Sequence, residues 1–142
     1  MSANKLIAAS AVEELKAVWS DRLPTWEEYL EAHQAGRVRG NKTIAATAIH
    51  ATPVPTVYKV IYGIITMWLG LLLVPAAIVA WFFASINVWW ILGAVVVSGF
   101  LISVSREGHC EGMKAGAARS EEFYEHLVAK GAFLFMPSSR KA

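Results

Sequence analysis

The sequence predicts an all-α membrane protein, built around an antiparallel hairpin of two transmembrane helices with amphipathic cytoplasmic helices at both ends. Two uncharged apolar runs predict this class: the first extends from Val60 to Phe83 and the second from Val88 to Ser105. Composition agrees, since 56% of the 142 residues are hydrophobic, and soluble domains average about 45–50%.

Charge and cysteine content exclude several classes of protein. The formal net charge is only +2, so no strong field is available to bind nucleic acid along a whole face. The single cysteine, Cys110, can form neither an intramolecular disulfide nor a cysteine-rich zinc site. We therefore expect lipid and side-chain packing to stabilise the fold.

Residues 1–36 are predicted to form two amphipathic cytoplasmic helices. Apolar residues recur at helical spacing from Ala3 to Ser20. Thr25, followed three residues later by Glu28, has the form of a capping box that would begin a helix over Trp26–Ala35. Residues 37–56, with three basic residues, one glycine and two prolines, are predicted to be a basic linker that leads to the membrane.

Residues 57–105 are predicted to be the hairpin, with spans at about 57–84 and 88–105 and a turn at 84–87. A stretch of about 20 residues crosses the hydrocarbon core of a bilayer. A turn of about four residues cannot return across the membrane, so the two helices must be antiparallel neighbours.

Charge and aromatic residues predict the orientation of the hairpin. Basic residues flank its open end and none lies in the turn, so both termini should face the cytoplasm. Aromatic rings favour the two membrane interfaces. The predicted interface anchors are Tyr58 at one interface and Trp81, Trp89 and Trp90 at the other.

Residues 106–142 are predicted to hold a glycine-rich juxtamembrane segment, a helix that begins after Ser120 and ends at Gly131, and a polar tail. Glycines at every fourth position would line one face of a helix that continues the second span, but three glycines also suit a flexible exit from the membrane. The predicted helix-packing residues are Gly99, Ser103, Gly108, Gly112 and Gly116. Pro75 predicts a kink in the first span.

The sequence holds little that could support catalysis. It has no phosphate-binding loop, no GxSxG and no HExxH motif, and the hairpin has no ionisable group suited to ion transport. We expect no catalytic residues, no cofactor and no metal. The alternative is an enzyme subunit or metal-binding protein that uses His109, Cys110, Glu122 and His126.

These features favour a non-enzymatic accessory or assembly subunit of a larger complex in the cytoplasmic (inner) membrane, such as a secretion, conjugation or energy-transducing assembly. Its expected partners are the lipid bilayer and other membrane protein subunits, with self-association open and nucleic acid excluded. The rival prediction is a homo-oligomeric, membrane-permeabilising protein of the holin type, because small two-span proteins with a basic tail fit that outline.

Overall fold

The computed structural model describes residues 3–19, 21–85 and 87–136, and the chain is mostly helical (73%). Two short strands pair within a helical framework. The elements are α1 (Ala3–Val18), α2 (Trp26–Gln34), β1 (Val38–Gly40), α3 (Lys42–Ala48), α4 (Thr56–Tyr58), the π-helix η1 (Lys59–Thr66), α5 (Met67–Ala84), α6 (Trp89–Ala117), α7 (Glu121–Val128) and β2 (Phe133–Phe135).

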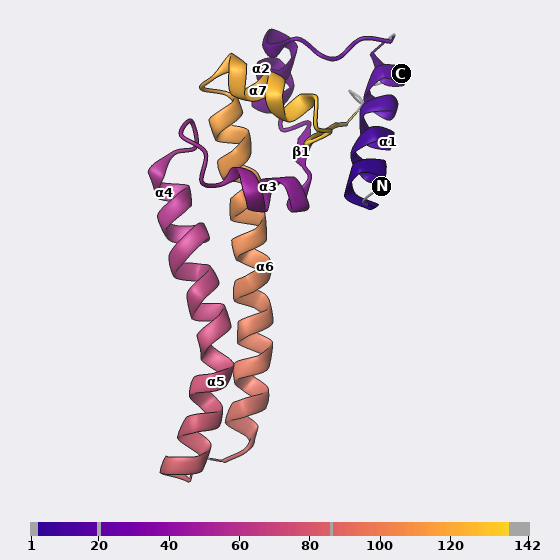
Figure 1. Cartoon of the computed structure of the whole chain (residues 1–142). Coiled ribbons are helices and arrows are strands. Elements are labelled where there is room, and N and C mark those ends of the chain that lie inside the picture. The colour runs from indigo at the N-terminus through magenta and orange to yellow at the C-terminus, as the bar shows by residue number, and fades with distance from the viewer. Residues whose placement is uncertain (1–2, 20, 86, 137–142) are drawn as a thin grey trace.

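Two long helices extend side by side away from a folded head (Figure 1). The first is the continuous helical stretch Thr56–Ala84, made of α4, η1 and α5, and the second is α6. We use "the head" for α1, α2, α3, α7, the two strands and the end of α6 that they surround. The first and last elements, α1 and β2, belong to the head, and the last turn of α5 and the first turn of α6 lie at the opposite end (Figure 1).

Both long helices are long and apolar enough to cross a membrane. In the most apolar part of each, only 11% and 17% of the residues are buried within the protein. The core helix of a soluble protein would be mostly buried. This exposure weakly indicates that the protein associates with a membrane.

Three aromatic rings form the centre of the head. Tyr29 lies 4.8 Å from Tyr124 and 5.0 Å from Phe133 between ring centroids. Buried phenols need hydrogen-bond acceptors. The Tyr29 hydroxyl donates to the Lys114 carbonyl at 2.8 Å, and the Tyr124 hydroxyl donates to the Pro24 carbonyl at 2.6 Å. Burial raises the pKa of both tyrosines, so they remain neutral donors that tie α2 and α7 into the head.

The predicted caps of α2 and α7 are confirmed. Thr25 Oγ1 accepts from the Glu28 N–H, and the Glu28 carboxylate accepts from the Thr25 N–H at 2.8 Å. Arg22 also donates to that carboxylate, and this hydrogen bond together with the one from Thr25 lowers the pKa of Glu28 to about 2. Ser120 Oγ accepts from the Phe123 N–H at 3.3 Å, as expected for the start of α7.

The segment expected to be a linker differs from the prediction, because it contains both β1 and α3. Strand β1 pairs antiparallel with β2, with Val38 opposite Phe135 and Gly40 opposite Phe133. Asn41 then caps α3 by accepting from the Thr43 N–H at 3.0 Å. Strands of three residues are too short to show an alternating pattern, so the sequence did not reveal this sheet. The end of the predicted polar tail, residues 137–142, lies outside the described residues.

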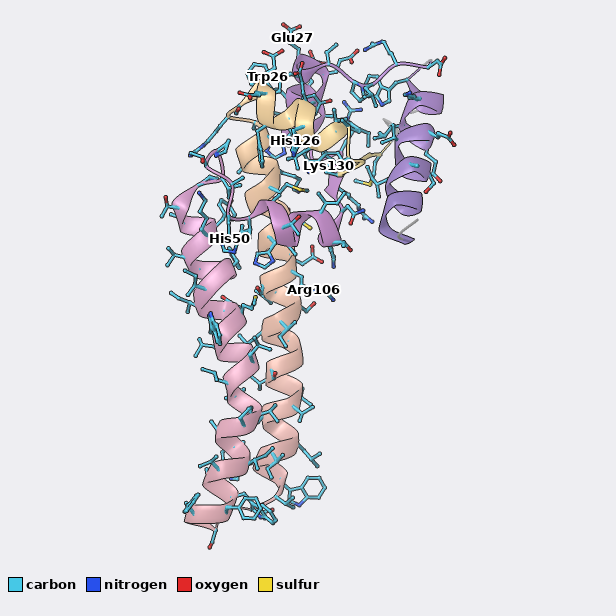
Figure 2. All side chains as sticks on the ribbon, viewed as in Figure 1. Trp26, Glu27, His50, Arg106, His126 and Lys130 are labelled. Carbon is cyan, nitrogen blue, oxygen red and sulfur yellow. The ribbon has the colours of Figure 1, made fainter. Side chains whose placement is uncertain are left out.

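The glycine-rich segment after the second apolar run is helical, because α6 continues through Arg106 to Ala117. Figure 2 places Arg106 where the long helices meet the head. Of the two alternatives for this segment, the helix is therefore correct and the flexible exit is not. α6 is the element that joins the long helices to the head.

Candidate interaction site

Serine hydroxyls join the two long helices. Ser98 Oγ donates to the Gly70 carbonyl at 2.5 Å, and Ser105 Oγ donates to the Tyr62 carbonyl at 2.6 Å. The two serines are seven residues apart, which places both on the same face of α6. On the first helix, Thr66 Oγ1 donates to the Ile61 carbonyl at 2.7 Å. These hydroxyls are thus used in hydrogen bonds within the protein.

Glycine also allows close contact along this seam. A Cβ on Gly70 would lie 3.0 Å from Ile102 and 3.4 Å from the Ser98 carbonyl, so α6 approaches the backbone of α5 here. Ala94 and Ser98, two small residues four positions apart on α6, are both buried. The seam therefore uses small residues and backbone acceptors, as is common between membrane helices.

Gly99 and Ser103, predicted to pack against a helix, lie elsewhere on α6. Ser103 is exposed, and a Cβ on Gly99 would meet nothing within 4 Å in the described part of the chain. Gly93 is equally open. This outer face of α6 is free for a helix of another protein, and its use in packing stays a prediction.

The other three predicted packing residues contact the chain itself. A Cβ on Gly108 would overlap the Tyr62 ring, and one on Gly112 would lie 2.8 Å from Ile49 and 2.9 Å from Tyr58. Gly116 is equally covered, with Val54 and Phe123 each 3.0 Å from such a Cβ. The glycine face of α6 thus receives side chains from η1, from α4 and the segment before it, and from α7.

The predicted interface anchors differ from one another in their surroundings. Three tryptophans lie at the ends of α5 and α6 remote from the head. Trp81 is 41% exposed, and Trp89 and Trp90 are each 70% exposed. Tyr58 instead packs against Gly112 and stacks on Tyr62, with a centroid distance of 6.0 Å. The kink predicted at Pro75 stays a prediction, and α5 runs through this residue as a helix.

A buried histidine lies beside the glycine face. His109 is only 5% exposed, and neither of its ring nitrogens has a hydrogen-bond partner among the described residues. A Cβ on Gly63 would lie 3.9 Å from His109 Nε2 and 3.7 Å from His50 Cε1, so both rings border η1. The sequence does not indicate this burial. His109 and Glu111 are both polar and lie two residues apart, yet His109 is buried and Glu111 is exposed.

The residues of the metal-binding alternative do not gather at one place. Cys110 lies against β1, with Sγ 3.6 Å from the Gly40 carbonyl, and Glu122 and His126 lie on α7. Figure 2 shows His126 in the head, well above the level of His50. Within residues 3–19, 21–85 and 87–136, no three His, Cys, Asp or Glu side chains are grouped so that they could hold a metal ion.

A charged groove of about 560 Å³ lies between β1, the start of α3 and α6. Lys42 forms an ion pair with Glu107, and Lys114 Nζ lies 2.6 Å from Glu111 Oε1. The fifth charged side chain in the groove is that of Arg39. No sequence pattern indicates the groove, because Arg39 and Lys42 fall within the predicted basic linker.

Comparison with known proteins finds no match, whether with family models, curated proteins or solved structures. The interpretation of the site therefore depends on its geometry and chemistry.

We predict opposite effects for two glycine-to-alanine substitutions in α6. Gly108→Ala should lower the free energy of unfolding by about 1–2 kcal/mol, because overpacking against Tyr62 outweighs the gain of roughly 1 kcal/mol in helix propensity. Gly99→Ala should be neutral or stabilising by up to about 1 kcal/mol, because its Cβ meets open space. Thermal unfolding in detergent, followed by circular dichroism, measures both, and equal effects would contradict the described packing.

Proposed function

We propose that this protein is a non-enzymatic accessory or assembly subunit of a larger complex in the cytoplasmic membrane. In this proposal, the two long helices cross the bilayer as a hairpin, and the head with both termini lies in the cytoplasm. One observation carries the proposal: an apolar pair of helices with an open outer face on α6 is continuous with a folded, charged head. Such an arrangement is suited to holding partners.

Charge and aromatic side chains support this orientation. The head and its boundary with the hairpin carry the basic residues, and the connection between α5 and α6 carries none. Exposed Trp81, Trp89 and Trp90 lie near that connection, where tryptophan would meet the far interface of the membrane. By the positive-inside rule, the head belongs on the cytoplasmic side.

The use of hydroxyl groups favours a packing subunit over a pore. A holin-type oligomer needs a polar stripe on the outer surface of its helices to line a wet channel. Ser98 and Ser105 instead donate to carbonyls inside the hairpin. On the outer face of α6, Ser103 stands between Gly99 and the end of the apolar run, which suits close contact with a helix better than contact with water.

We predict the sidedness of two variants, each with one added cysteine, in intact cells. Ser85→Cys, at the connection, should react with a membrane-impermeant maleimide added outside. Glu27→Cys, at the end of the head remote from the hairpin (Figure 2), should react only after permeabilisation. Native Cys110 is 4% exposed and should give little background. Labelling of Glu27→Cys alone from outside would contradict the orientation.

The proposed function itself predicts a protein partner on the outer face of α6. A photo-crosslinking amino acid placed at Ser103 should give an adduct with a different membrane protein in the native host, because this face is open. The matched control is Leu72 on α5, which is 56% exposed and lies outside the predicted packing face. It should give much less of that adduct.

Two outcomes would contradict the accessory-subunit proposal. One is an adduct only between copies of this chain, combined with prompt loss of membrane potential on induced expression, which favours the holin-type alternative. The other is extraction of a free monomer in mild detergent with no adduct at either position. Mass identification of the adduct would name the complex.

A further inference from the structure

The charged groove carries side chains of both signs within one concave surface. Its charged lining residues are Arg39, Lys42, Glu107, Glu111 and Lys114, and the remainder of its wall includes Gly40 of β1 and Cys110 of α6. Three cations and two anions leave a net charge of +1. A purely basic patch would suit any anion, whereas this mixture suits a ligand that carries both a negative and a positive group.

The groups in the groove differ in how firmly they are held. Lys114 is 13% exposed, and it contacts Glu111 at 2.6 Å and the Val38 carbonyl at 3.5 Å. Lys42 and Glu107 are 51% and 60% exposed, and an exposed pair of this kind exchanges easily with another ionic partner. Lys114 is thus the firmly positioned group, and it contacts one oxygen of Glu111, whose side chain is 54% exposed and open to a further partner.

Arg39 is the group best suited to a phosphate. Its side chain is exposed, and in the described ranges its guanidinium makes no hydrogen bond or ion pair. A guanidinium is planar and can donate two parallel hydrogen bonds to a phosphate. Lys42 lines the same groove and can add a second positive charge.

The groove on α6 begins at the height of the headgroup layer of a bilayer and extends just beyond it. The uncharged run of α6 ends at Ser105, and a rise of 1.5 Å per residue places Glu107 about 3 Å and Glu111 about 9 Å beyond it. The headgroup layer on each side of the hydrocarbon core is about 5–7 Å thick. A lipid whose head enters the groove would run its acyl chains along the exposed apolar surface of the long helices.

We propose that this groove binds the headgroup of a phospholipid that carries a primary ammonium, such as phosphatidylethanolamine. Arg39 and Lys42 hold the phosphate, and Glu111, with Glu107 when Lys42 moves to the ligand, accepts hydrogen bonds from the ammonium. The inference depends on the membrane placement proposed above. Phosphatidylcholine has the same net charge but no ammonium N–H, so the two lipids separate hydrogen-bond recognition from general electrostatic attraction.

The test is lipid retention by the full chain in nanodiscs of equimolar phosphatidylethanolamine and phosphatidylcholine, measured by native mass spectrometry after the discs are stripped. The wild type should retain the ethanolamine lipid over the choline lipid by roughly fivefold. Arg39→Gln should reduce retention of both lipids, and Glu111→Gln should remove the preference. Arg119→Gln and Glu125→Gln, exposed and outside the groove, are the matched controls and should behave as wild type.

Each other outcome would overturn the inference. Equal retention of the two lipids by the wild type would show that the groove does not recognise the ammonium. The same conclusion would follow if Glu111→Gln kept the preference for the ethanolamine lipid. Binding of free phosphoethanolamine to detergent-purified protein with the same strength and variant profile would show that the ligand is not a lipid. Release of the chain from native membranes by alkaline carbonate, with neither lipid retained, would instead overturn the membrane placement itself.

Discussion

The structure depends on the close approach of bulky side chains to the glycine face of α6. Gly108, Gly112 and Gly116 lie where the apolar part of α6 enters the head, and each is covered by side chains from other elements. Three glycines cost a helix roughly 3 kcal/mol relative to alanine. Full burial of a large apolar side chain contributes about 1.5–3 kcal/mol, so the buried Ile49 and Val54, with the half-buried rings of Tyr58 and Tyr62, can together offset that cost.

This contact explains how a hairpin with little buried surface carries a folded head. Packing on Gly108 and Gly112 fixes η1 and α4 against α6 at the head end of the first apolar run, and packing on Gly116 fixes α7. Because α6 is one continuous helix, the head and the hairpin share a single rigid element. A partner that binds the outer face of α6 would therefore act on the element around which the head is built.

The sequence predicted the parts of the structure that have a strong local signal. Long uncharged runs predicted the two long helices, and the residues Thr25, Glu28 and Ser120 predicted two helix starts through their capping chemistry. The four-residue spacing of glycines predicted a packed helix face, but it could not say that the covering residues come from the same chain. That information lies in contacts between residues far apart in the sequence.

The parts that the sequence did not predict depend on such long-range contacts. Strand β1 forms because β2, almost a hundred residues later, pairs with it and because Gly40 admits Met113 and Cys110 of α6. The charged groove exists only once β1 and α3 lie against α6. From the sequence alone, Arg39 and Lys42 are indistinguishable from solvated charges of a linker. In the folded protein they line the same groove as Glu107 and Glu111.

Hydrogen–deuterium exchange of the full chain in nanodiscs measures the stability of α6 at the membrane boundary, where its glycine face is packed. If the glycine face holds the head on α6, backbone amides of residues 108–117 should exchange as slowly as those of α7 and of the hairpin seam. Their protection should fall together with that of α7 in Gly112→Val, where the new side chain cannot fit beside Ile49 and Tyr58. Rapid exchange of residues 108–117 beside a protected hairpin would show that the glycine face is not packed and would identify a flexible exit from the membrane.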